Sequence, residues 1–200
     1  MLIIFMGASD LGWECCRVLF EMEQDVIGIF SIPKEFWISW SPTPVTNVRH
    51  KSFQDIADAR RVPLINVTSK MSDPTYEEII AKLKPDIFMV IGWYYMVPRS
   101  IRALAPRGAV GIHASLLPKY RGGAPLGWTI IRGETQTGVT LFYFDNGIDD
   151  GDIIGQKRFS IGFDETIADV IQKASQASVQ LLRECVPLLA SGNAPRRKHE

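Results

Sequence analysis

A histidine, a fixed turn and a downstream carboxylate form the part of this sequence best suited to chemistry. His113 stands in the run 111–123 (GIHASLLPKYRGG), and Asp149 follows in an acidic stretch. A carboxylate beside an imidazole can orient it as a proton carrier in general acid–base catalysis. Pro118 fixes the chain direction after the histidine, and the glycine pair at 122–123 lets backbone approach a ligand closely. The run therefore predicts a reaction centre.

The same run carries two cations, Lys119 and Arg121. They could meet an anionic group of a substrate, or they could be the solvated side chains of a surface loop. The sequence leaves both interpretations open.

The acidic stretch 145–152 (DNGIDDGD) resembles a calcium-binding loop but fails its spacing. An EF-hand loop needs glycine at position six and glutamate at position twelve, whereas counting from Asp145 gives Asp150 and Gln156. Asn-Gly at 146–147 is instead a common pair in hairpin turns. We expect a turn that presents Asp149.

Short apolar runs and helical patterns alternate along the chain, and Asp10 and Asp164 are placed to cap helices. This alternation predicts an α/β fold with a doubly wound, mostly parallel sheet, on which ligands lie beyond the carboxyl ends of the strands. His113 ends one such strand. Residues 31–50 read as one long loop. We expect strands at 2–6, 25–30, 63–67, 86–91, 109–113, 139–144 and 153–161, and helices at 10–22, 52–60, 74–84, 125–132 and beyond 164.

The amino-acid composition limits the partners, the redox state and the location that we expect for this protein. Lysine plus arginine and aspartate plus glutamate both number 22, so no global basic field exists to attract a nucleic-acid backbone. Three cysteines without CxxC spacing predict reduced thiols, with neither a disulfide framework nor a metal site. No apolar run is long enough for a signal peptide or a membrane span, so we expect a soluble, cytoplasmic protein. One domain at 1–190 and a polar C-terminal tail at 191–200, with a solvated basic run at 196–198, complete the expected organisation.

Two further segments allow a structural or a ligand-binding interpretation. The run 7–12 (GASDLG) lacks the dinucleotide fingerprint and the P-loop lysine, so it is a tight strand-to-helix turn unless a phosphate binds at the helix N-terminus. The run 92–98 (GWYYMVP) suits core packing, or the wall of a site for a flat heteroaromatic ligand.

Three segments together resemble the folate-dependent formyltransferase family: 113–122 (HASLLPKYRG), 137–140 (TGVT) and 149–154 (DDGDII). The family includes methionyl-tRNA formyltransferases, glycinamide ribonucleotide formyltransferases and formyltransferases of nucleotide-linked amino sugars. The resemblance runs from the first strand to about residue 190. It implies a Rossmann-like formyltransferase fold and direct transfer of a formyl group from 10-formyltetrahydrofolate to a primary amine, with no metal and no covalent enzyme intermediate.

The resemblance also implies the role of each site residue. His113 would relay the proton between the amine and the departing folate nitrogen, and Asp149 would hold the imidazole. Substrate binding would fall to Lys119, Arg121 and Gly123. Folate binding would fall to Tyr95, Met96, Val97, Ser115, Leu116, Leu117, Pro118, Asp145, Asn146, Gly147, Ile148 and Asp149.

One position departs from the family pattern. The family's Asn-x-His places an asparagine two residues before the histidine, where its amide stabilises the oxyanion of the transition state, but here that position is Gly111. Removing one oxyanion donor typically costs about 10²–10³ in rate. A water or another donor could take its place, the protein could be a weakened or non-catalytic relative, or the change could be engineered. We favour an active variant subfamily.

The resemblance says least about which amine accepts the formyl group. The run 119–126 (KYRGGAPL) sits closer to the tRNA and amino-sugar branches than to the purine enzyme, and the balanced charge disfavours tRNA. We expect a nucleotide-linked amino sugar, with methionyl-tRNA as the first alternative and a non-catalytic folate- or nucleotide-binding protein as the second. A homodimer is compatible with the sequence. A Rossmann oxidoreductase is disfavoured by the missing dinucleotide fingerprint.

Overall fold

The computed structural model describes residues 1–38 and 41–199. Its chain divides into two compact units, Met1–Ala109 and Val110–Glu200. The expectations for residues 39, 40 and 200, at the centre of the 31–50 loop and at the end of the polar tail, lie outside the described residues.

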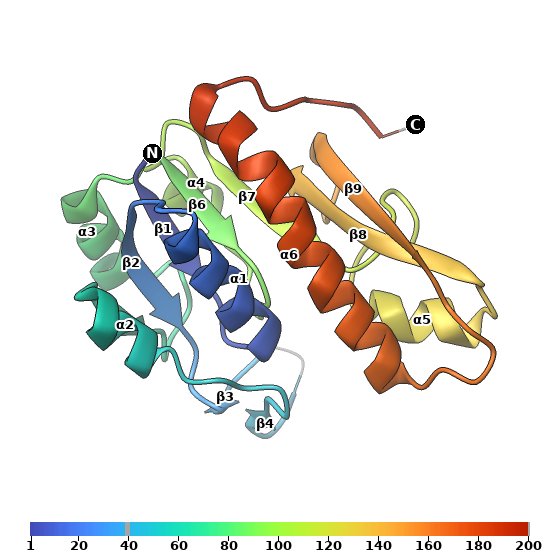
Figure 1. Cartoon of the computed structure of the whole chain (residues 1–200). Coiled ribbons are helices and arrows are strands. Elements are labelled where there is room, and N and C mark those ends of the chain that lie inside the picture. Colours follow the sequence, from blue (N-terminus) through green and yellow to red (C-terminus); the bar gives the residue numbers. More distant parts are fainter. Residues whose placement is uncertain (39–40, 200) are drawn as a thin grey trace. The chain divides into compact units, whose positions relative to one another are not determined.

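Four parallel strands form the sheet of the first unit (Figure 1). Their spatial order is β5 (Leu64–Asn66), β2 (Val26–Ser31), β1 (Ile3–Met6) and β6 (Ile87–Val90). Every residue of β1 and β6 is buried. A parallel strand covered on both faces has this continuous apolar sequence, so the expected α/β class is confirmed in this unit.

The helices of the first unit largely follow the expected positions: α1 (Asp10–Glu21), α2 (Gln54–Arg60), α3 (Pro74–Leu83) and the unforeseen four-residue α4 (Arg99–Arg102). The expected cap of α1 was wrong by one residue. Ser9 is the N-cap and its hydroxyl accepts a hydrogen bond from the amide of Gly12, whereas Asp10 is already helical. Serine and aspartate cap equally well, so adjacent candidates cannot be ranked from sequence.

The expected loop at 31–50 contains a small hairpin of β3 (Glu35–Phe36) and β4 (Val45–Thr46). Phe36 is buried, and its ring lies 5.2 Å from that of Tyr94 and 5.7 Å from that of Tyr95. Two-residue strands are too short to show a periodic pattern, which is why the sequence did not indicate them.

The second unit is an antiparallel sheet with two helices. β7 (Ala109–His113, whose first residue belongs to the first unit) pairs with β8 (Gln136–Tyr143), and β8 pairs with β9 (Ile153–Ser160). The 25-residue α6 (Ile167–Ser191) packs on β8 and β9, and α5 (Pro125–Ile131) contacts α6. No helix among the described residues is long and apolar enough to cross a membrane.

Helix α6 begins with a capping box that was not predicted from the sequence. Thr166 is the N-cap, and its hydroxyl and backbone exchange hydrogen bonds with Asp169, so the expected cap at Asp164 was wrong. The reciprocal pair satisfies two orphan donors of the first turn, which a lone aspartate does not.

The basic run near the C-terminus docks on the second unit. Arg197 forms a β-bridge with Ile153, the guanidinium of Arg196 lies 3.7 Å from the ring centre of Tyr143, and Lys198 Nζ lies 2.9 Å from Asp152 Oδ1. These contacts hold the pKa of the Asp152 carboxyl below its usual value, mainly through the Lys198 hydrogen bond. The prediction that the basic run 196–198 is solvated is therefore only partly correct.

Candidate active site

His113 and Asp149 meet in the second unit. His113 Nδ1 lies 3.4 Å from Asp149 Oδ2, and the two side chains are 10% and 23% exposed. His113 pairs with Thr140, three residues before β8 ends, so the loop 144–152 must double back along the sheet to bring its carboxylate to the imidazole. Strand register alone would leave the two groups apart.

Asp149 is held in place at both its backbone and its side chain. Its φ of 49° lies in the left-handed region, which aspartate and asparagine tolerate better than most residues. Its Oδ2 accepts a hydrogen bond of 2.9 Å from the amide of Gly122, whose own φ is 88°. The carboxylate thus joins the turn after β7 to the loop after β8.

The second nitrogen of His113 also has a protein partner. Nε2 lies 2.7 Å from the carbonyl oxygen of Tyr120. A carbonyl oxygen and a carboxylate can only accept, so Nε2 donates to Tyr120, and Nδ1 donates to Asp149 when the ring carries both protons. The imidazole is therefore oriented at both nitrogens.

The turn after His113 is fixed by buried hydrogen bonds around a cis peptide between Leu117 and Pro118. Thr140 Oγ1 donates to the Ser115 carbonyl and accepts from the Leu117 amide. Gln156 Nε2 donates to the Leu117 carbonyl at 2.9 Å, and the Ser115 hydroxyl donates to the Lys119 carbonyl at 2.6 Å. The Ser115 hydroxyl and the Leu117 peptide groups are thus used by the protein; folate binding by residues 115–118 stays a prediction.

Gly111 shares a face of β7 with His113, as residues two apart on a strand do. It is buried and pairs with Phe142, which in turn pairs with Ile153. Directly opposed residues of antiparallel strands project to the same side of the sheet. The row of side chains beside Gly111 is therefore formed by Phe142 and Ile153, which are apolar. The row offers no side-chain amide in place of the family's asparagine.

The expected substrate residues lie on the accessible part of the turn. The side chain of Lys119 is 70% exposed and its Nζ lies 3.8 Å from Glu134 Oε1. Arg121 contacts His199 of the C-terminal tail, and Gly123 has open space around its Cα. They remain predicted substrate contacts.

The expected folate segment of the first unit mixes buried and exposed side chains. Val97 is buried, Met96 is 74% exposed, and the ring of Tyr95 lies 6.1 Å from that of Trp93. Trp93 Nε1 is buried and has no hydrogen-bond partner among the described residues. This unused donor is a candidate ligand contact that the sequence reading missed, because burial of a single indole nitrogen leaves no pattern in the sequence.

The remaining folate candidates lie in the loop after β8. Ile148 is 63% exposed, and the Gly147 amide donates to Asp150 Oδ2 at 3.0 Å. Asp145 accepts a hydrogen bond from the amide of Asn146. This geometry is that of an exposed turn beside Asp149, and its contact with folate stays a prediction.

The glycine-rich turn after β1 is closed by its own contacts. The amides of Ala8 and Asp10 donate to the carbonyls of Gly92 and Arg49, and the Gly12 amide donates to the Ser9 hydroxyl. A Cβ at Gly12 would lie 2.5 Å from the Ile91 carbonyl oxygen. These contacts favour the tight-turn interpretation over a phosphate loop. An ion pair joins Arg49 to Asp10, and no sequence pattern predicted it.

The three cysteines are free and buried. Burial raises the pKa of the Cys185 thiol to about 11 and those of Cys15 and Cys16 further. Within the described residues, no group of three or more histidine, cysteine, aspartate or glutamate side chains could hold a metal ion.

Comparison with known proteins identifies the family of the chain. Residues 38–186 match the model of the formyl transferase family. The chain belongs to this family. It is 34% identical to a methionyl-tRNA formyltransferase of Desulforamulus reducens over 98% of its length, and 37% identical to one of Syntrophus aciditrophicus over 72%. It spans 60% and 46% of those two proteins.

Solved structures show the same fold at lower identity. Glycinamide ribonucleotide transformylase 1 from Symbiobacterium toebii matches with a TM-score of 0.78 and 17% identity, over 100% of this chain and 93% of that one. An N-formyltransferase from Helicobacter canadensis, solved with folinic acid and dTDP-3-aminofucose, matches with a TM-score of 0.76 and 21% identity, over 100% and 68%. The expected Rossmann-like formyltransferase fold, with its mostly parallel sheet, is confirmed.

Proposed function

We propose that the chain transfers a formyl group from 10-formyltetrahydrofolate to a primary amine. The observation that carries the proposal is the contact of His113 with Asp149, beside the turn after β7 and within the motif that resembles the family's. The imidazole is held by a carbonyl on one side and a carboxylate on the other, an arrangement that suits proton transfer.

The proton path follows from the two partners of the ring. We expect the amine and the departing folate nitrogen to take the place of the Tyr120 carbonyl, because Asp149 is anchored by Gly122 and keeps Nδ1 oriented. A bond then forms between the amine nitrogen and the formyl carbon, and the bond from that carbon to the folate nitrogen breaks. Nε2 gives its proton to the departing nitrogen and takes one from the amine.

Two observations bear on how the substrates fit. The unpartnered Trp93 Nε1 lies among the aromatic side chains of the predicted folate segment and supplies a donor for a heteroaromatic ring. In contrast, the row of Gly111 offers no donor for the oxyanion, so we assign that task to water or to backbone amides. The chain acts as a variant family member without the asparagine amide.

The folate assignment can be tested at Trp93. Trp93→Phe removes the unused donor and keeps an aromatic ring, so the dissociation constant for 5-formyltetrahydrofolate should rise roughly fivefold, the value of one neutral hydrogen bond. Calorimetric titration measures it. The free energy of unfolding should stay level or rise, because a buried unsatisfied group is lost. Unchanged folate affinity would remove Trp93 from the site.

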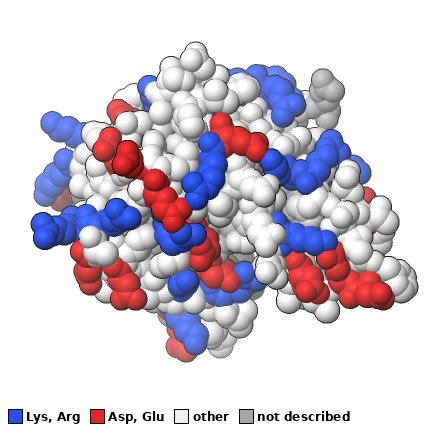
Figure 2. Space-filling model, in the orientation of Figure 1, with Lys and Arg blue, Asp and Glu red and all other residues white. Residues whose placement is uncertain are grey.

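For the acceptor, we propose a nucleotide-linked amino sugar. The supporting observation is charge: Lys plus Arg equals Asp plus Glu, and basic and acidic side chains interleave over the face drawn in Figure 2. A small acceptor needs no extended basic surface, whereas a polynucleotide does. Lys119 and Arg121 suffice for a diphosphate. The free cysteines suit action in the cytoplasm.

Methionyl-tRNA is the second candidate, favoured by the names of the relatives that are 30–37% identical. One assay separates the two. Release of tetrahydrofolate is followed with dTDP- and UDP-linked amino sugars and with charged initiator tRNA over a range of salt. Turnover with a sugar supports the first proposal; steeply salt-dependent turnover with tRNA supports the second. Folate binding without transfer to either acceptor would identify a non-catalytic relative.

A further inference from the structure

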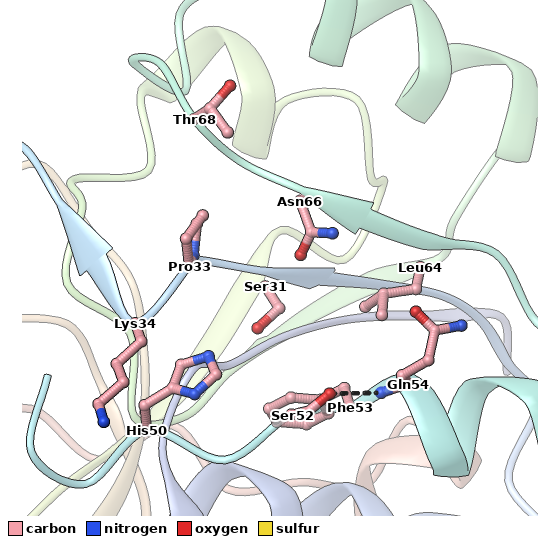
Figure 3. A pocket seen from close by; sticks show the side chains of 10 residues that line it. All are labelled: Ser31, Pro33, Lys34, His50, Ser52, Phe53, Gln54, Leu64, Asn66 and Thr68. Carbon is pink, nitrogen blue, oxygen red and sulfur yellow. Dashed lines mark hydrogen bonds between the residues drawn. The ribbon is translucent and has the colours of Figure 1, made fainter.

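A polar cavity of about 380 Å³ lies within the first unit, at the carboxyl ends of β2 and β5 (Figure 3). Ser31 ends β2, Asn66 ends β5, and the two are register partners in the sheet. Ligands of open α/β sheets lie beyond this end of the strands. The formyl-transfer proposal makes no use of this cavity.

Ser31 contributes an available hydroxyl to the lining of the cavity. The residue is 3% exposed, yet its hydroxyl makes no hydrogen bond to any residue that the structure describes, and it points into the cavity (Figure 3). The Ser31 hydroxyl is therefore available to bond to a molecule in the cavity.

His50 and Lys34 add two more unused donors. Neither side chain has an ion pair or hydrogen bond within the described part of the chain, although both backbones are fixed: the His50 amide donates to the Asn47 carbonyl, and the Lys34 carbonyl accepts from the Asn47 amide. His50 also bridges to Ser9. The positions are set by the protein, while the polar ends remain available.

The lining selects the chemistry of the ligand. None of the described residues that line the cavity carries a carboxylate; their polar groups are hydroxyls, amides, an imidazole and an ammonium. Phe53 and Leu64 add an apolar wall. Donors and a cation without a carboxylate suit an anion with several oxygens, and the volume lies within the range of about 300–1,000 Å³ typical of sites for whole small molecules.

We infer that this cavity binds the phosphate monoester of a small metabolite. The phosphoryl oxygens accept hydrogen bonds from Ser31, His50 and Lys34, and the organic part lies against Phe53 and Leu64. The site is independent of formyl transfer, so direct binding tests it whatever the acceptor proves to be.

The experiment is a titration of the full chain, ¹⁵N-labelled, with pairs of probes. AMP is compared with adenosine, ribose 5-phosphate with ribose, and inorganic phosphate is added alone. We expect amide shifts at Ser31, Lys34, His50 and Asn66 with the esters and at least tenfold weaker effects with the unphosphorylated partners. Equal binding of adenosine and AMP, equal binding of free phosphate and the esters, or no shifts at these residues at millimolar concentration overturns the inference.

Variants tie the binding to the assigned donors. Ser31→Ala, His50→Gln and Lys34→Ala should each weaken binding of the better ester about tenfold, the loss typical of a hydrogen bond to a charged group. Matched controls outside the cavity are Ser72→Ala and Lys70→Ala, which should leave affinity unchanged. Amide spectra that match the parent protein outside the cavity establish that each variant is folded. A folded Ser31→Ala with parental affinity contradicts the inference as well.

Discussion

Two glycine-bearing turns follow strands in this protein, one after β1 and one after β7, and they differ in how closely they are packed. At the first, a Cβ on Gly12 would lie 2.5 Å from the Ile91 carbonyl, and one on Gly92 would lie 2.0 Å from the Ser9 hydroxyl oxygen. At the second, a Cβ added to Gly122 or Gly123 would have nothing within 4 Å. The first turn is closed by backbone contacts, and the second leaves space beside His113.

This difference shows that glycine has two uses at a strand end. In the turn after β1 it lets a helix and a neighbouring strand approach each other, so the glycines there contribute to packing. In the turn after β7 the glycines shape a loop around an imidazole and a carboxylate, so their contribution is to the site. Substitutions in the turn after β1 should therefore lower stability, whereas substitutions in the turn after β7 can also lower activity.

The largest effect is expected at the imidazole and its carboxylate. His113→Ala and Asp149→Asn should each lower the rate of formyl transfer about 10²–10⁴-fold, the usual contribution of general acid–base catalysis. Asparagine tolerates the left-handed backbone of position 149, so only the charge is lost. The measurement is kcat/KM with saturating folate, next to calorimetric folate affinity, which should change little.

The control for this pair is Asp164→Asn, an exposed carboxylate of the same unit whose loss should leave the rate unchanged. Near-parental turnover of both His113→Ala and Asp149→Asn would refute the roles given to these residues and make the second turn as purely structural as the first.

The next effect is on stability and compares two helical glycines. Gly12→Ala should destabilise the protein by about 1–3 kcal/mol, because the new methyl group meets a backbone carbonyl that cannot move aside. Gly127→Ala in α5 meets nothing closer than 4.0 Å, so it should stabilise by about 1 kcal/mol through helix propensity. Urea unfolding midpoints measure both. A stabilising Gly12→Ala would show that the first turn is open.

A smaller effect separates the adjacent glycines of the second turn. Gly122→Ala places a side chain at a φ of 88° and should cost about 1–2 kcal/mol, with some loss of activity because the same residue's amide holds Asp149. Gly123→Ala, with no such backbone conformation and open space, should change neither. Equal effects of the two substitutions in unfolding and turnover measurements would count against the Gly122–Asp149 contact.

The smallest expected change is at the position that departs from the family. Gly111→Asn restores the family pattern on the face of β7 that carries His113, so the variant should fold and its activity should be equal or slightly higher, because we assign the oxyanion to water or backbone amides in the parent protein. Steady-state turnover, together with the unfolding midpoint as a check on the buried strand, measures it. A large loss of activity in a folded variant would show that position 111 is more than a vacated donor site.

Prediction from sequence succeeded where the signal was local and long. The buried strands β1 and β6 and the helices α1 and α3 follow apolar runs and helical spacing, and the motif around His113 indicated the family before any geometry was known. Prediction failed where several residues share a local preference. Ser9 rather than Asp10 caps α1, Thr166 rather than Asp164 caps α6, and the two-residue strands of the 31–50 segment show no period.

The site itself was predicted only as a set of residues. The sequence placed His113 at a strand end and proposed Asp149 as its partner, but the Tyr120 carbonyl on Nε2 and the unused indole of Trp93 arise from how distant segments pack. Every residue has the same backbone carbonyl group, so no sequence motif can indicate which carbonyl will face an imidazole.

The sequence by itself determined the class of fold, the family and the identity of the two groups that could move a proton, because apolar periodicity and a dense motif are properties of adjacent residues. Tertiary structure alone decided that the loop 144–152 doubles back to bring Asp149 Oδ2 3.4 Å from His113 Nδ1, that the turn after β1 is closed, and that Ser31 lines a cavity at the ends of β2 and β5. These outcomes depend on contacts between segments far apart in the chain, where packing and hydrogen bonding, rather than local preference, set the lowest free energy.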